Sequence, residues 1–190
     1  SIEAIKANLE IFKHLNDESL RASQYMAKVL GEPEWTEGYG VRNTHRIAVA
    51  PNMSSAILVG GTSQGIEPIF SNIYQQKMAG GTVNRVNPTL LKLMRMRGVY
   101  SQELVDDIGM NYDGSVQDAK FDWLTPHEKL VFKTAYEIEQ TVIVDLAADR
   151  QPFVCQAQSI NLFFLGDATE AYISDVHAYA ISNPWIKSLY

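Results

Sequence analysis

The amino-acid sequence predicts an α/β fold. Short apolar segments with β-branched residues, such as residues 46–50 and 159–164, are typical of strands. Between the strand-like segments lie helical patterns of about 10 to 15 residues, and this alternation favours some parallel pairing. A chain of 190 residues has room for one domain, and it contains no internal repeat, low-complexity tract or long linker. We therefore expect residues 1–190 to form a single domain without a linker.

The first third of the chain predicts a long helix followed by a loop and a strand. Residues 2–30 carry apolar side chains at spacings of three to five positions, which suits one amphipathic helix or a pair interrupted near residues 16–19. Glycine and proline at residues 31–33 end this pattern. Residues 46–50 are expected to form a buried strand that brings the chain to Pro51.

The rest of the chain carries clear local signals for turns and helix starts. Residues 71–78 and 83–86 flank a glycine-rich turn and predict a hairpin. Thr125 and Glu128 have the spacing of a capping box around Pro126 at the first helical position. The other expected elements are helices over residues 88–97, 101–108, 125–138, 139–149 and 168–181, and strands over residues 159–164 and 185–190.

Charge and cysteine content exclude several classes of function. Sixteen Lys and Arg against 22 Asp and Glu give a net charge of −6, which argues against broad electrostatic contact with nucleic acid or an anionic membrane. An anionic ligand must therefore be held by local geometry. The single cysteine, Cys155, cannot form an internal disulfide, which indicates a reducing compartment such as the cytoplasm. No apolar run approaches the roughly 18 residues that a membrane helix needs.

The turn after the expected strand is the best candidate for a binding site. Its residues are Pro51, Asn52, Met53, Ser54 and Ser55. Backbone N–H groups at a helix N-terminus, with two hydroxyls and an amide beside them, suit a phosphate without any Lys or Arg. An ordinary Ser or Asn helix cap explains the same residues more simply and stays open at this point. The chain has neither a Walker loop nor a dinucleotide-binding glycine fingerprint.

Other polar residues give weaker signals. The four histidines lack the spacing of metal ligands, so we expect surface or capping roles and no metal; they are His14, His45, His127 and His177. Asp106 and Asp107 are adjacent and point to different sides of a helix, which makes them a poor acid–base pair. Glu67 is interpreted as a residue that orients a loop. Cys155, in an apolar stretch, is interpreted as an inert packing residue.

Several short motifs, taken together and in order, resemble one family. They are residues 42–45 (RNTH), 48–55 (AVAPNMSS), 65–68 (GIEP), 71–74 (SNIY), 86–91 (VNPTLL), 111–117 (NYDGSVQ), 147–150 (AADR), 156–162 (QAQSINL) and 186–190 (IKSLY). In these motifs the chain resembles the C-terminal part of the class I ribonucleotide reductase large (α) subunit, of phage or bacterial type. The resemblance extends from about Gly38 to Tyr190.

The resemblance implies a fold, a reaction and site residues. The fold is the C-terminal portion of a ten-stranded α/β barrel, which is incomplete in this chain. The reaction is reduction of a ribonucleoside diphosphate at its 2′ carbon by thiyl-radical chemistry. Residues 51–55 correspond to the family's substrate phosphate loop, in which Asn52 and Met53 replace the usual small hydroxyl residues. Tyr190 corresponds to the first tyrosine of the family's radical-relay pair.

The resemblance also implies partners, because the family's catalytic cysteines have no counterpart here and Cys155 stands where the family has none. The implied partners are the remaining large-subunit polypeptide that carries those cysteines, a radical-generating small subunit, usually with two metal ions, a thioredoxin or glutaredoxin reductant, and a second copy of the complete large subunit. The chain itself is expected to hold no cofactor and to be inactive alone. One alternative is a noncatalytic module for nucleotide-phosphate binding or assembly derived from that subunit. Another, an unrelated α/β domain, would require the ordered motifs to be coincidence.

Overall fold

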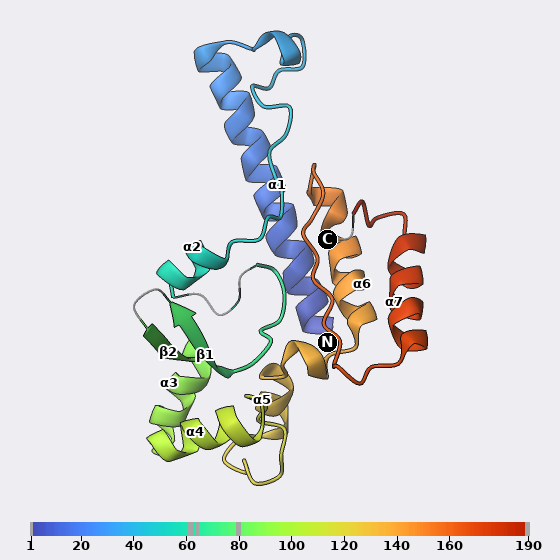
Figure 1. The fold of residues 1–190 in the computed structure, drawn as a ribbon. Coiled ribbons are helices and arrows are strands. Elements are labelled where there is room, and N and C mark those ends of the chain that lie inside the picture. The colour runs from blue at the N-terminus through green and yellow to red at the C-terminus, as the bar shows by residue number, and fades with distance from the viewer. Residues whose placement is uncertain (1, 61–62, 64, 79–80, 189–190) are drawn as a thin grey trace. The chain divides into compact units, whose positions relative to one another are not determined.

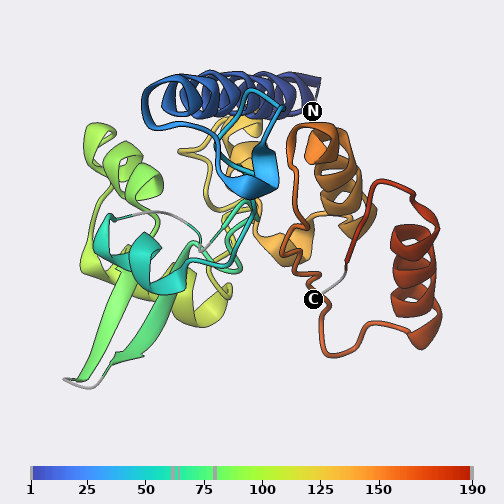
Figure 2. The same cartoon turned by 90° about the horizontal axis from the view of Figure 1, so that it is seen from above.

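The computed structural model describes residues 2–60, 63, 65–78 and 81–188 (Figures 1 and 2). The chain divides into two compact units. Unit 1 comprises Ser1–Pro51, Gln140–Leu162 and Asp167–Tyr190, and unit 2 comprises Asn52–Glu139 and Phe163–Gly166. Each unit therefore combines segments that lie far apart in the sequence. The expectation of one domain without a linker stays a prediction.

Unit 1 is built mainly from helices. Its elements are α1 (Ile2–Leu30), η1 (Glu34–Thr36), α6 (Gln140–Arg150), η3 (Gln151–Phe153) and α7 (Glu170–Ser182). Helix α6 packs against both α1 and α7, and the three helices lie next to one another with α6 in the middle (Figure 1). The helices predicted over residues 139–149 and 168–181 are confirmed to within two residues at each end.

Helix α1 is continuous, so the interrupted pair that the sequence left open does not form. Phe12 is buried on α1 and packs with Val49 and Val154 in the core of unit 1. Further along α1, the buried Ser23 Oγ accepts hydrogen bonds from the backbone N–H groups of Arg42 (3.0 Å) and Asn43 (2.9 Å). These two hydrogen bonds hold residues 42 and 43 beside helix α1.

The predicted strands of unit 1 are reduced to a single bridge. Val49 forms an isolated parallel bridge with Gln158, and Ser159 N–H donates to the Val49 carbonyl at 2.8 Å. The expected strands at residues 46–50 and 159–164 are therefore wrong. Within the described residues no second bridge extends this pairing, so the two segments do not form a β-ladder. Residues 185–188 do not form the last expected strand either. Asn183 accepts hydrogen bonds from the backbone N–H groups of residues 185 and 186, and these bonds close a local turn.

Unit 2 combines a hairpin with short helices. Its elements are α2 (Met53–Leu58), β1 (Ile73–Met78), β2 (Gly81–Val86), α3 (Pro88–Met96), α4 (Gln102–Asn111), α5 (Pro126–Val131) and η2 (Ala135–Glu137). Strands β1 and β2 pair antiparallel, from Ile73 opposite Val86 to Met78 opposite Gly81, which confirms the predicted hairpin. The buried core of this unit consists of Ile73, Leu90, Met94, Val105, Ile108, Val116, Phe121, Leu124 and Phe132.

Helix α5 begins as predicted and ends earlier. Thr125 and Glu128 form the capping box that the sequence indicates. The helix stops at Val131 instead of continuing to Ile138, because the next residue, Phe132, turns into the core. Thr134 then starts the short helix η2 with a capping box of its own, so the expected long helix is two shorter ones.

Candidate functional site

Residues 51–55 lie at the entry to helix α2, two residues after the parallel bridge at Val49. Ala56 N–H donates to the Asn52 carbonyl (2.9 Å) and Val59 N–H donates to the Ser55 carbonyl (3.1 Å). The helix therefore begins at Met53, and the N–H groups of its first turn have no partner within the helix itself. The predicted strand-to-helix turn is present, with one bridge in place of a full strand.

The turn presents its polar groups on the protein surface. Asn52, Ser54 and Ser55 are exposed. Helix α2 has only six residues, so its macrodipole is small and individual backbone N–H donors must carry any binding of an anion. Such donors at a helix start suit a phosphate oxygen. Phosphate binding by this loop stays a prediction.

Cys155 helps to hold the segment that leads into the loop. Its sulfur accepts hydrogen bonds from the backbone N–H groups of Arg46 (2.9 Å) and Ile47 (3.0 Å). Burial alone would raise the pKa of this thiol, but the hydrogen bonds at Ile47 and Arg46 outweigh it, so the pKa of Cys155 lies below its usual value. The side chain is exposed, so the expected packing role is wrong, whereas the expectation that Cys155 takes no part in catalysis stays a prediction.

A buried polar cluster fixes Gln158, the partner of Val49. Arg150 Nε donates to Gln158 Oε1 at 2.5 Å, and Gln158 Nε2 donates to the Ala147 carbonyl and to Gln151 Oε1, both at 2.8 Å. Arg150, Gln151 and Gln158 are each 3% exposed. Arg150 and Gln158 lie in motifs that carry the family resemblance, but the sequence alone predicts no role for them. The signal that could have found them is a long polar side chain in an otherwise apolar stretch.

A second cluster explains three further motifs as structural. Asn72 Nδ2 donates to the carbonyls of Gly114 (3.1 Å) and Phe132 (2.7 Å). Asn87 Nδ2 donates to Asn72 Oδ1 (2.9 Å), while Asn87 Oδ1 caps helix α3 through Thr89 N–H (3.0 Å). The amides thus tie the hairpin, α3 and the chain after α4 together inside unit 2. In the described residues the asparagines of these motifs therefore have a structural role.

The remaining candidates lie apart from the loop in the sequence. Tyr190, the expected relay tyrosine, lies outside the described residues. Asp106 accepts a hydrogen bond from Gln102 Nε2, whereas Asp107 pairs with Lys120 at 2.5 Å, which lowers the pKa of Asp107. The two carboxylates therefore serve different partners. Glu67 is half-buried, and its loop-orienting role stays a prediction.

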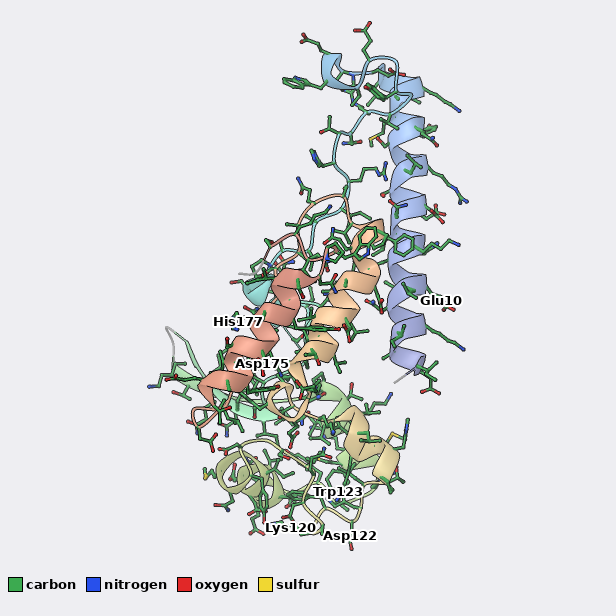
Figure 3. The ribbon with its side chains drawn as sticks, turned by 90° about the vertical axis from the view of Figure 1, so that its right-hand side faces the viewer. Glu10, Lys120, Asp122, Trp123, Asp175 and His177 are labelled. Atoms are coloured by element: carbon green, nitrogen blue, oxygen red, sulfur yellow. The ribbon has the colours of Figure 1, made fainter. Side chains whose placement is uncertain are left out.

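The described residues contain no candidate metal site. His14, His45 and His127 are exposed, and His177 is half-buried on α7, where Figure 3 also labels Asp175. Among the residues that the structure covers, no three His, Cys, Asp or Glu side chains gather as metal ligands would. The described helices also include none with the length and apolar character to cross a membrane.

A parallel bridge that leads through a loop into a helix is typical of α/β folds, and its presence agrees with the class that the sequence predicts. Residues 33–190 match the model of the family described as "Ribonucleotide reductase, barrel domain". The chain belongs to this family. The predicted family and the α/β barrel class, with only part of the barrel in this chain, are thereby confirmed.

Relatives and a solved structure agree with this assignment. The putative ribonucleoside-diphosphate reductase large subunit of Frog virus 3 is 41% identical over 180 residues, covering 95% of this chain and 31% of that protein. The large subunit of Invertebrate iridescent virus 6 is 35% identical, covering 100% of this chain and 20% of that protein. The class Id ribonucleotide reductase alpha subunit of Actinobacillus ureae superimposes with a TM-score of 0.86 at 37% identity, covering 100% of this chain and 34% of that one. The chain thus spans a fifth to a third of the length of these proteins.

Proposed function

We propose that this chain is part of the large subunit of a ribonucleoside-diphosphate reductase and contributes the substrate phosphate loop, residues 51–55, and a radical-relay tyrosine, Tyr190. The observation that carries the proposal is the family match over residues 33–190, which includes both sites. In the reaction, the ribose 2′-hydroxyl leaves as water while a cysteine pair is oxidised to a disulfide. The substrate is a ribonucleoside diphosphate, and the radical comes from a small subunit.

The loop binds the substrate phosphate through backbone donors. The chain has a net charge of −6, so a diphosphate gains little from the overall field of the protein. The N–H groups of Met53, Ser54 and Ser55 open helix α2 and have no partner within that helix. Charge-assisted hydrogen bonds from such groups do not depend on side-chain chemistry, which is why Asn52 and Met53 are compatible with this role.

The thiols of the reaction lie outside these 190 residues. Cys155 is the only cysteine, and one thiol cannot supply both a thiyl radical and a reducing pair. The proposed complex therefore joins this chain to the large-subunit polypeptide that carries the catalytic cysteines. It also includes a second large subunit and the small subunit, with thioredoxin or glutaredoxin as reductant, in the cytoplasm.

Backbone donation by the loop is tested with Met53→Pro. Proline removes one N–H at the first helical position, where its fixed φ is tolerated and no helical hydrogen bond is lost. Losing one charge-assisted bond costs about 1.5 kcal/mol, so we expect roughly a tenfold weaker Kd for a nucleoside diphosphate by calorimetry. Ser54→Ala keeps the backbone donor and should change the Kd by about twofold or less.

The matched control is Gln102→Pro, which makes the same change at the start of α4 after the N-cap Ser101. This variant should bind the nucleotide as the wild type does. Equal affinity of the wild type and Met53→Pro would count against the loop as a phosphate site.

A mixing experiment distinguishes a catalytic role of this chain from nucleotide binding alone. The chain is combined with a large-subunit polypeptide that carries the catalytic cysteines, together with the small subunit and thioredoxin, and deoxynucleotide formation is measured. Activity that requires both polypeptides supports the proposal. Nucleotide binding without activity, in the mixture and in a fusion of the two, would instead identify a noncatalytic binding or assembly module.

A further inference from the structure

Arg150 is a buried cation without a counter-ion among the described residues. Its side chain is 3% exposed at the end of α6. The ion pairs in the described part of the chain are Arg21–Glu18, Arg97–Glu128 and Lys120–Asp107. Burial lowers the pKa of Arg150 to about 10, so the guanidinium remains charged at neutral pH. Proteins rarely bury a charge without an opposite charge beside it.

The guanidinium has one edge that its neighbours leave open. Its Nε–H donates to Gln158 Oε1, and its central carbon lies 5.6 Å from the centroid of the Phe12 ring, which covers one face. The other four N–H donors of an arginine are on Nη1 and Nη2. No acceptor for them is present among the residues that the structure describes.

The terminal nitrogens of this edge are not fully buried. The buried side-chain atoms that lack a partner in the described residues are Arg46 Nε, Trp123 Nε1 and Ser159 Oγ. The terminal nitrogens of Arg150 also have no hydrogen-bond partner among the described residues, but they do not belong to these fully buried atoms, so each keeps some accessible area. The side chain is therefore almost entirely inside the protein, and its terminal nitrogens keep a small accessible area.

The position of this edge is fixed before any ligand arrives. Gln158 accepts from Arg150 while its own amide donates to Ala147 and Gln151, and Gln151 Nε2 donates to the carbonyls of Val154 (2.8 Å) and Gln156 (3.0 Å). The acceptor that orients the guanidinium is thus held by a network of buried amides. A preorganised donor loses little conformational entropy when it binds.

We propose that the Nη1–Nη2 edge of Arg150 binds a carboxylate from an acidic side chain outside these 190 residues. The two parallel N–H groups of this edge match the two oxygens of a carboxylate in an end-on, bidentate pair. The remaining large-subunit polypeptide is the source of this side chain, and that assignment of the source rests on the proposed function.

The experiment measures the melting temperature of the full 190-residue chain in acetate and in chloride at equal ionic strength. We expect acetate to raise Tm relative to chloride by a few degrees, because a ligand that binds only the folded state stabilises it. Arg150→Met should abolish this difference. The matched control is Arg21→Met, which removes a surface arginine whose side chain is 72% exposed and should keep the wild-type response. An equal acetate effect in wild type and Arg150→Met would overturn the proposal.

A second measurement uses the wild-type chain alone, so it does not depend on whether a variant folds. The ¹⁵N and ¹H resonances of the Arg150 Nε–H group should shift on titration with acetate and stay constant with chloride. A shift with inorganic phosphate and none with acetate would overturn the proposal of a carboxylate ligand and would indicate a phosphate-type ligand instead. Neither measurement involves a nucleotide or reductase activity, so failure of this inference leaves the proposed function intact, and the loop and mixing experiments judge that function separately.

Discussion

Two backbone N–H groups give Cys155 its chemical character. Both come from residues more than 100 positions earlier, Arg46 and Ile47, and both point at the sulfur. Hydrogen bonds to a thiolate stabilise the deprotonated form, and the positive charge of Arg46 acts in the same direction. The exposed sulfur is therefore accessible and more acidic than an ordinary thiol.

We expect Cys155 to be alkylated at lower pH than an unperturbed thiol. Because the pKa is lowered in the folded chain, the thiolate fraction at any pH below the usual value is larger than in the unfolded chain. The rate of reaction with iodoacetamide should thus reach its half-maximum at lower pH for folded protein than for protein in urea. Superimposed pH–rate profiles would contradict the hydrogen-bonded thiolate.

At the scale of elements, two helix starts show how burial changes the value of a cap. Thr125 caps α5 at an exposed site through a capping box with Glu128. Asn87 caps α3 at a buried site, where the same side chain also donates to Asn72 Oδ1. Loss of the first cap exposes backbone groups to water, whereas loss of the second also leaves a buried amide oxygen without a partner.

Asn87→Ala should therefore destabilise the chain more than Thr125→Ala. We expect Thr125→Ala to cost about 1 kcal/mol, the usual value of a lost cap. Asn87→Ala should cost about 2 to 3 kcal/mol, because the unsatisfied Asn72 oxygen adds a desolvation penalty of about 1 to 2 kcal/mol. Urea unfolding of both variants measures the difference. Equal losses would mean that water replaces Asn87 at Asn72.

Elements with local signals were predictable from the sequence, and elements that depend on distant partners were not. The hairpin and the start of α5 are encoded within a few residues by glycines and by Thr125, Pro126 and Glu128. The strand at residues 46–50 depends on Gln158, more than 100 positions later, and the pairing ends after one bridge. Apolar β-branched composition indicates that a segment is extended. It does not indicate how many residues of a distant segment will pair with it.

In the candidate site, too, the part with local signals was predictable from the sequence and the part that depends on distant residues was not. The loop at residues 51–55 was predictable, because a helix start follows from proline and serine next to an apolar segment. The cluster around Arg150 was not, since its environment combines Phe12 from α1 with Gln158 from beyond α6. Proximity in three dimensions gave both Arg150 and Cys155 properties that their sequence neighbours do not indicate.

At the scale of the whole molecule, each unit has its own core. Phe12, Val49 and Val154 belong to the core of unit 1, and the larger cluster around Leu90 and Phe121 belongs to unit 2. Apolar packing stabilises the elements that share it, and regions with separate cores can open separately. A change confined to one core therefore tests whether the chain behaves as one cooperative domain or as two.

Gly114 is the most informative position for this test. Its φ is +78°, and an added Cβ would lie 1.9 Å from Ser71 Oγ and 2.9 Å from the backbone nitrogen of Asn72, so Gly114→Ala combines backbone strain with a clash inside unit 2. Gly98 has a similar φ of +69° with nothing within 4 Å of the added Cβ, so Gly98→Ala carries the strain alone. We expect costs of about 3 kcal/mol or more and about 1 kcal/mol, respectively.

Hydrogen exchange followed by mass spectrometry reports the two units separately. About 3 kcal/mol corresponds to roughly 100-fold faster exchange through opening, and we expect this acceleration in β1 and α4 of unit 2 for Gly114→Ala. Gly98→Ala should accelerate the same segments by about fivefold. Helix α6 of unit 1 should exchange at its wild-type rate in both variants, because its packing partners are α1 and α7. Acceleration of α6 to the same extent as α4 would instead show one cooperative domain, because a strain placed at Gly114 would then have lowered the stability of both cores together.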